Sequence, residues 1–228
     1  MPNNDYIKKL KEEKKIINTW GRLVNFRVKA IKKYAGRKIL DAGCSTGIYV
    51  KYLSEHNYEA YGIDILPDEN WKGKLESHFK AGDICNLPYE NNFFDTVMAF
   101  EVLEHVEDAN KALKELYRVT GNNIIISVPN CFQSEAFKQS GFSFYHWSDR
   151  SHIQTFTQET LKRILEKSGF SVNIISCVNP VFPEILILSS WYIPIKLSRF
   201  IARIANKMPL RKKYYMTLLA VASKNQKV

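Results

Sequence analysis

The sequence lacks the features that mark several large classes of protein. Its four cysteines, Cys44, Cys85, Cys131 and Cys177, lie at least 41 positions apart and form no C-x-x-C pair, which argues against a zinc cluster and for reduced thiols. No apolar run reaches the roughly 18 residues that a membrane-spanning helix needs. The lysine-rich segment 1–15 has no apolar core of a signal peptide. We therefore expect a cytoplasmic location.

Residues 185–228 contain no acidic residue, and the charge of the chain is distributed unevenly along the sequence. The net charge of the 228 residues is +10, but residues 1–38 and residues 185–228 each carry +9, while residues 39–184 carry −8. Basic segments attract phosphate-bearing partners such as nucleic acid, anionic lipid or a phosphorylated small substrate. Charge alone does not separate these partners from a solvated lysine-rich surface.

The remaining pattern is an alternation of short apolar runs and helical periodicity. Strands are predicted at 38–41, 59–63, 79–81, 96–100, 123–128, 170–178 and 214–222, with helices at 6–34, 47–55, 108–119 and 157–167. Such alternation is typical of an α/β domain with a mostly parallel sheet and helices on both faces. We expect one domain over 1–228, with N-terminal helices over 1–36, a core over 37–178, a helical insertion over 179–213, and the last strand and tail over 214–228.

Three strand ends carry residues suited to a nucleoside ligand. The turn Asp41–Gly47 has the form D-x-G-x-x-x-G and lacks two of the three glycines of the dinucleotide-binding fingerprint. Asp64 ends the next strand, 21 residues after Gly43, where a carboxylate can accept hydrogen bonds from both hydroxyls of a ribose. Asp83 and Ile84 follow the third strand and suit an adenine amino group and ring.

These segments resemble, in order, the motifs of class I S-adenosylmethionine-dependent methyltransferases, with the small-molecule branch that includes quinone-biosynthesis O-methyltransferases as the nearest likeness. The resemblance covers roughly residues 25–178 and is carried by 39–47, 62–64, 82–88, 94–95 and 101–106. It implies a doubly wound, Rossmann-like sheet of seven strands whose last strand is antiparallel. Ser45 departs from the family, in which many members have glycine, but a small residue there should still permit binding.

The resemblance also implies which residues hold S-adenosylmethionine. Gly43 and its turn would bind the methionine portion, Asp64 the ribose, and Asp83 with Ile84 the adenine, while Phe100 would line the cofactor near its sulfur. Arg27 resembles an arginine that holds the cofactor carboxylate in quinone methyltransferases. The predicted cofactor residues are Arg27, Asp41, Gly43, Gly47, Asp64, Ile65, Asp83, Ile84 and Phe100.

Methyl transfer from a sulfonium is an in-line displacement, so alignment contributes most of the acceleration, and an oxygen acceptor additionally needs a base near neutral pH. His152 is the first candidate for the base or for an acceptor contact, because it lies on the connection after the fifth strand. The segment from His152 to Thr157 resembles the H-x-x-F-T of this branch, with three residues instead of two between the histidine and Phe156. His146 is the second candidate. His105 is the third, although a structural hydrogen bond explains it better. No His, Asp or Glu grouping has a metal-ligand spacing, so we expect no metal.

The insertion combines an apolar stripe with a basic one. Leu197, Phe200, Ile201, Ile204 and Met208 recur at helical spacing, and Lys196, Arg199, Arg203 and Lys207 form a separate row. Segment 184–208 is thus predicted to bind an anionic membrane surface or a lipid-linked acceptor, which would make the protein peripheral on the inner face of the membrane. The alternatives are packing on the sheet or on a second subunit in a homodimer.

The activity expected is methyl transfer to a small-molecule or lipid-linked acceptor, most simply at oxygen. One alternative is an RNA methyltransferase that uses the basic ends, which is disfavoured because no N/D-P-P-Y-type motif follows the fourth strand. Another is a cofactor-binding scaffold without catalysis.

Overall fold

The computed structural model describes residues 22–132, 135, 139, 149, 151–208 and 213–224. Within these residues, seven strands form one sheet in the order β3-β2-β1-β4-β5-β7-β6. The strands are β1 (Lys38–Ala42), β2 (Glu59–Asp64), β3 (Phe79–Ala81), β4 (Phe94–Phe100), β5 (Thr120–Pro129), β6 (Phe170–Val181) and β7 (Tyr214–Lys224). Strands β1 to β5 pair in parallel, whereas β7 runs antiparallel to both β5 and β6. The sheet predicted from the sequence, with its antiparallel last strand, is confirmed.

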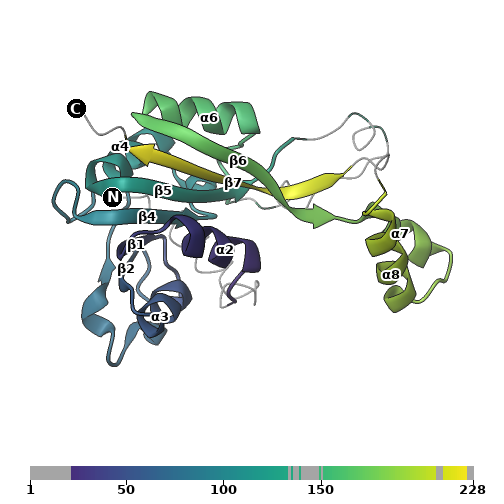
Figure 1. Ribbon diagram of the computed structural model, residues 1–228, viewed down its shortest axis with the longest axis horizontal. Coiled ribbons are helices and arrows are strands. Elements are labelled where there is room, and N and C mark those ends of the chain that lie inside the picture. The colour runs from purple at the N-terminus through teal and green to yellow at the C-terminus, as the bar shows by residue number, and fades with distance from the viewer. Residues whose placement is uncertain are drawn as a thin grey trace.

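Helices cover both faces of the sheet (Figure 1). The described helices are α2 (Asn25–Tyr34), α3 (Ile48–Glu55), α4 (Ala109–Val119), α6 (Gln158–Lys167), α7 (Pro183–Ser190) and α8 (Ile195–Ala205), with short 3-10 turns at Glu69–Trp71, Glu76–His78 and Leu103–His105. Helices α4 and α6 pack one apolar layer against the sheet, and α2 and α3 pack the other. The predicted helix over 6–34 lies partly outside the described residues.

The central strands are apolar because both of their faces are covered. In β4 the stretch from Thr96 to Phe100 is buried, and in β5 the stretch from Ile124 to Pro129 is buried. Local capping sets the helices that follow: the side chain of Asp108 accepts a hydrogen bond from Lys111 N before α4, and that of Thr157 accepts one from Thr160 N before α6. These strands are rigid supports for the loops at their ends.

The insertion starts later than the sequence predicted. Strand β6 continues to Val181, which pairs with Tyr214, so the segment between the last two strands is 182–213 rather than 179–213. The strand passes through Pro180, which has no N–H to donate, and it can do so because β6 is an edge strand.

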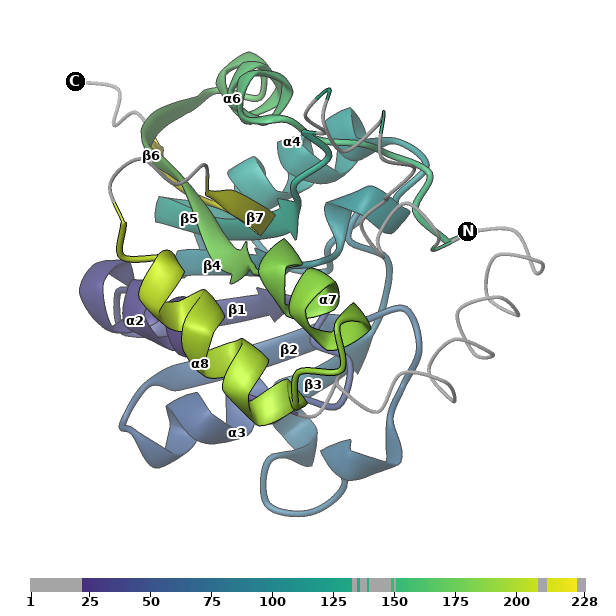
Figure 2. The ribbon, with the colours of Figure 1, turned by 90° about the vertical axis from the view of Figure 1, so that its right-hand side faces the viewer.

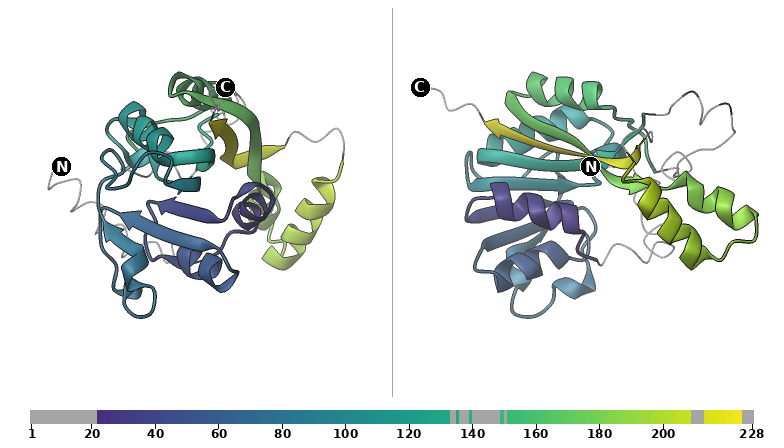
Figure 3. Two further views of the ribbon diagram at one scale, coloured as in Figure 1. Left: turned by 60° about the vertical axis from the view of Figure 1, so that its left-hand side comes forward. Right: turned by 45° about the vertical axis from the view of Figure 1, so that its right-hand side comes forward.

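Helices α7 and α8 form a hairpin that extends beyond the carboxyl ends of the strands (Figure 1; Figure 3, right). Strand β6 runs in the same direction as β5, because each is antiparallel to β7, and α7 begins directly after it. The hairpin therefore stands at the edge of the sheet where the parallel strands end, and Figure 2 shows it from outside.

Candidate active site

A cavity of about 590 Å³ opens at the carboxyl ends of the parallel strands. Residues from the loops after β1, β2, β3 and β4 line one part of it, and Asn179 near the end of β6 with Met216 and Thr217 near the start of β7 line another. A single cavity is thus shared by the predicted cofactor residues and by His152.

The turn after β1 brings the backbone close to its neighbours. Gly43 has φ +82°, and a Cβ there would lie 2.3 Å from Cγ2 of Val102. Its N–H donates to the carbonyl of Ile63 at 2.7 Å. Gly47 does not line the cavity, and a Cβ there would meet the ring of Phe79 at 2.5 Å. Gly43 thus belongs to the cavity wall, whereas Gly47 supports the turn by packing.

Two carboxylates are fixed along the wall by backbone donors. Asp64 accepts hydrogen bonds from Ser45 N at 2.8 Å and from Leu66 N at 3.0 Å. Asp83 accepts one from Cys85 N at 2.8 Å. These bonds orient both carboxylates before any ligand arrives. Four of the predicted cofactor residues, Asp64, Ile65, Asp83 and Ile84, line the cavity.

A buried polar cluster lies deeper in the cavity wall. Burial and the nearby Asp64 raise the pKa of Asp41 to about 7. Arg27 donates to Glu101 Oε1 at 2.7 Å, and its guanidinium carbon lies 5.1 Å from the centre of the Phe100 ring. Among the described residues, Asp41 Oδ2 and Arg27 Nε have no hydrogen-bond partner although both are buried. One acidic and one basic group with unused capacity suit a ligand that carries both an amino group and a carboxylate.

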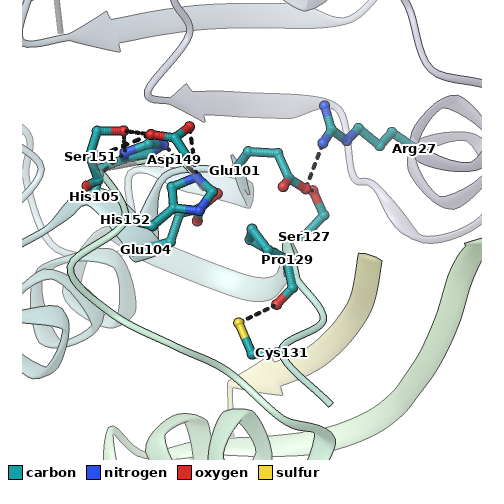
Figure 4. A network of polar contacts seen from close by, with 10 residues as sticks. All are labelled: Arg27, Glu101, Glu104, His105, Ser127, Pro129, Cys131, Asp149, Ser151 and His152. Carbon is teal, nitrogen blue, oxygen red and sulfur yellow. Dashed lines mark hydrogen bonds and ion pairs between the residues drawn. The ribbon is translucent and has the colours of Figure 1, made fainter. Parts of the chain in front are cut away.

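Two histidines from distant segments meet at the other part of the cavity (Figure 4). The ring centres of His105 and His152 are 4.8 Å apart. Nδ1 of His105 lies 2.9 Å from Ser151 Oγ, and Nε2 of His152 lies 3.4 Å from Asp149 Oδ2. Burial, reinforced by His152, lowers the pKa of His105 to about 4, so its imidazole is neutral at neutral pH and a weak base. His146, the second candidate from the sequence, lies outside the described residues.

Sequence reasoning missed two acids on the wall, Glu101 and Glu104. Glu101 has φ +54°, and its Oε1 accepts hydrogen bonds from Arg27 and from Ser127 Oγ. Glu104 is 1% exposed, and burial together with Glu101 raises its pKa well above the usual value. The sole signal in the sequence was their place after the fourth strand. Glu104, His105 and His152 have ligand atoms within 4.8 Å of one another, a grouping that sequence spacing did not predict.

Comparison with known proteins identifies the family of this site. The family model for a methyltransferase domain matches residues 13–173. The chain belongs to the S-adenosylmethionine-dependent methyltransferases. The family resemblance seen in the sequence, and with it the cofactor, is confirmed.

Named relatives act on different small molecules. A demethylmenaquinone methyltransferase of Staphylococcus saprophyticus is 30% identical over 182 residues, which cover 67% of this chain and 77% of that protein. An ajmaline N-methyltransferase of Rauvolfia serpentina is 25% identical over 173 residues, which cover 68% of this chain and 55% of that protein. This chain therefore spans about half the length of the ajmaline enzyme. The structure of 1,6-didemethyltoxoflavin-N1-methyltransferase of Burkholderia thailandensis, with bound substrate and S-adenosylhomocysteine, has a TM-score of 0.63 at 14% identity and covers 97% of this chain and 86% of its own. At that identity the likeness concerns the fold.

The cavity of this methyltransferase fits S-adenosylmethionine on its own features. Gly43 contributes bare backbone to the cavity wall, because Val102 fills the space that a side chain there would need, and Asp64 lines the same cavity. The unpartnered atoms of Asp41 and Arg27 match the two charged groups of a methionine moiety. Phe100 also lines the cavity and is 8% exposed.

Proposed function

We propose that the protein transfers the methyl group of S-adenosylmethionine to an oxygen atom of a small, largely apolar acceptor by in-line displacement. The observation that carries this proposal is the position of His152. It lies on the wall of the cavity that also holds the predicted cofactor residues, with Asp149 beside its Nε2. A proton acceptor is needed when the nucleophile is a hydroxyl group.

Each predicted residue has a part that this geometry supports. Asp64 would accept hydrogen bonds from the ribose, Asp83 and Ile84 would contact the adenine, and Asp41 with Arg27 would hold the methionine end. The cofactor, when bound, supplies an electrophilic methyl group on a positively charged sulfur. Proximity and orientation then contribute most of the rate, so the chain's main task is to hold the acceptor oxygen in line.

His152 would remove the acceptor's proton or hold the acceptor by a hydrogen bond. The carboxylate of Asp149 lies 3.4 Å from Nε2 of His152 and orients its ring. His105 is assigned a supporting part instead, because it is neutral at neutral pH and its Nδ1 lies within hydrogen-bond reach of Ser151.

His152→Ala should lower turnover by about 100-fold or more, since general-base catalysis contributes roughly 10²–10⁴-fold. Affinity for S-adenosylhomocysteine should stay within about twofold. The measurement is transfer of a labelled methyl group to a panel of phenols, quinols, amines and carbon acids. His56→Ala is the matched control, because His56 is an exposed histidine whose Nδ1 lies 2.7 Å from Tyr52 O, away from the cavity. Full activity of His152→Ala, or transfer to nitrogen or carbon acceptors alone, would refute the proposal.

We further propose that the acceptor is lipid-linked and that the α7–α8 hairpin rests on an anionic membrane surface. The large apolar side chains of the hairpin are exposed: Trp191 is 70% exposed, Tyr192 97% and Phe200 60%. On α8 the buried residues are the small Ser198 and Ala202. The alternative in which α8 packs its apolar stripe on the sheet is therefore wrong.

The hairpin is also joined to the cavity. Asn179, just before α7, and Met216 and Thr217, just after the insertion, line the cavity wall. An acceptor with an apolar tail could then lie along the hairpin with its head group in the cavity. No described helix is long and apolar enough to cross a bilayer. Surface binding accordingly depends on the exposed apolar side chains and on the basic row of α8.

Sedimentation with vesicles tests this surface. The protein should bind vesicles that contain phosphatidylglycerol, and binding should fall with added salt and in Phe200→Glu. Arg199→Glu with Arg203→Glu should weaken binding by at least about 10-fold, because each basic residue contributes on the order of 1 kcal/mol near anionic lipid. Arg163→Glu is the matched control, on exposed α6 and paired with Glu159 at 3.9 Å. Absence of binding, together with a dimer that Phe200→Glu dissociates, would assign the surface to a second subunit.

A further inference from the structure

We propose that Glu104, His105 and His152 form a binding site for one divalent transition-metal ion at the acceptor end of the cavity. Each residue offers one ligand atom, and these atoms lie within 4.8 Å of one another. All three side chains line the cavity. Figure 4 shows His105, His152 and Glu104 gathered together with Asp149, on the side of Glu101 away from Arg27.

Glu104 is the observation that points to a cation. Its side chain is 1% exposed, and neither carboxylate oxygen has a hydrogen-bond partner among the described residues. Its backbone carbonyl, by contrast, accepts from Ile153 N at 2.9 Å and from Gln154 N at 3.0 Å, so the segment around it is well fixed. Buried carboxylates are normally paired, hydrogen-bonded or bound to a metal. A bound cation would satisfy both oxygens.

The surrounding contacts leave His105 ready to bind through one nitrogen. Its Nδ1 lies 2.9 Å from Ser151 Oγ and 3.3 Å from the Ser151 carbonyl, while its Nε2 lies 4.0 Å from Glu104 Oε1. Ser151 Oγ in turn donates to Asp149 Oδ1 at 2.7 Å. A partner on one ring nitrogen that fixes the tautomer and orientation is the usual support for a histidine metal ligand.

The other charged group at this cluster is Asp149. Its Oδ2 lies 3.4 Å from His152 Nε2, close enough to orient that ring or to complete the ligand set. Two imidazole nitrogens and one carboxylate oxygen suit Zn²⁺, Co²⁺ or Fe²⁺, and they disfavour Mg²⁺ and Ca²⁺, which prefer oxygen ligands alone.

The position of the site suggests what the ion would do. Three protein ligands leave at least one coordination position, and the cavity adjoins the cluster. An acceptor hydroxyl bound there would release its proton to solvent in the cavity more easily, because the ion favours the oxyanion. This role of the ion rests on the proposed function. His152 would then bind the ion with the nitrogen lone pair that, without a metal, would take the proton of the acceptor hydroxyl. Metal binding itself does not depend on that function.

The test is titration of the chelator-treated full chain with ZnCl₂ by calorimetry, and with CoCl₂ by visible absorption, without cofactor or acceptor. We expect one equivalent of Zn²⁺ and a Co²⁺ spectrum typical of four or five ligands. Glu104→Gln and His152→Ala should each weaken Zn²⁺ binding by at least about 100-fold, while His56→Ala leaves it unchanged. Affinity for S-adenosylhomocysteine is measured for every variant, and it should be unchanged where the fold is intact.

The possible results of these titrations distinguish the metal site from the proposed function. No binding by the unaltered chain, or equal binding in Glu104→Gln and His152→Ala, overturns the site. If Glu104→Gln loses S-adenosylhomocysteine as well, His152→Ala decides, because its side chain is 14% exposed and less essential for packing. Methyl transfer to oxygen by a chain that does not bind Zn²⁺ would overturn the metal site and leave the proposed function. Zn²⁺ binding by a chain that transfers no methyl group to oxygen would overturn the proposed function and leave the metal site.

Discussion

Replacing Asp64 with alanine should weaken S-adenosylhomocysteine binding by at least about 30-fold, equivalent to about 2 kcal/mol. Two causes add in this variant. The carboxylate is the predicted acceptor for the ribose hydroxyls, and it also holds the turn by accepting from Ser45 N and Leu66 N. Calorimetric titration measures the change directly.

Two further variants divide these causes. Asp64→Asn keeps one acceptor oxygen for the backbone but removes the charge, so we expect an intermediate loss. Asp68→Ala is the matched control, because Asp68 is an aspartate in the same connection whose carboxylate accepts from Asn70 in a capping turn. Unchanged affinity in Asp64→Ala would remove Asp64 from the cofactor site.

Gly43→Ala should lower the free energy of unfolding by about 3 kcal/mol and abolish measurable cofactor binding. A left-handed backbone costs a residue with a Cβ roughly 1–2 kcal/mol, and crowding a packed site costs about 1–3 kcal/mol more. The crowding comes from Val102, a stiff β-branched residue whose Cγ2 would lie 2.3 Å from the new methyl group. Urea unfolding gives the stability.

Gly73 supplies the control for the backbone contribution alone. It has φ +106°, and no atom lies within 4 Å of a Cβ built there, so Gly73→Ala should cost about 1–2 kcal/mol without affecting cofactor binding. Val102→Ala combined with Gly43→Ala should recover part of the loss. Equal losses in Gly43→Ala and Gly73→Ala would show that the close approach to Val102 has no energetic weight.

The grouping of the strand-end residues in one cavity wall, where we predict the cofactor, was predictable from the sequence for a geometric reason. In a parallel sheet the carboxyl ends of neighbouring strands meet at one edge, so Gly43, Asp64 and Asp83, each placed at a strand end, had to lie close together. Short apolar runs identified those strands, and turn residues marked where each one ends. Gly47 obeyed the same pattern but faces Phe79 instead of the cavity.

The acceptor half could not be predicted in the same way. Glu104 lies in a short turn where an acid usually faces water, and nothing local shows that it is 1% exposed. His105 and His152 are 47 positions apart, and their ring contact depends on how the segment before α6 packs against the turn after β4. Such long-range closure is a property of the whole fold, whereas periodicity and capping are properties of a few neighbouring residues.

The order of strands at the sheet edge has a consequence for synthesis on the ribosome. Strand β7 lies between β5 and β6 although it is made after both of them. Until β7 has left the ribosome, β5 and β6 each lack the strand that pairs with them, and the apolar side chains of the α7–α8 hairpin are exposed even in the folded protein. Unpaired edges and exposed apolar surface are the features that make nascent chains aggregate and recruit chaperones. The insertion of β7 is thus the step that closes the sheet, and the nascent chain needs protection until then.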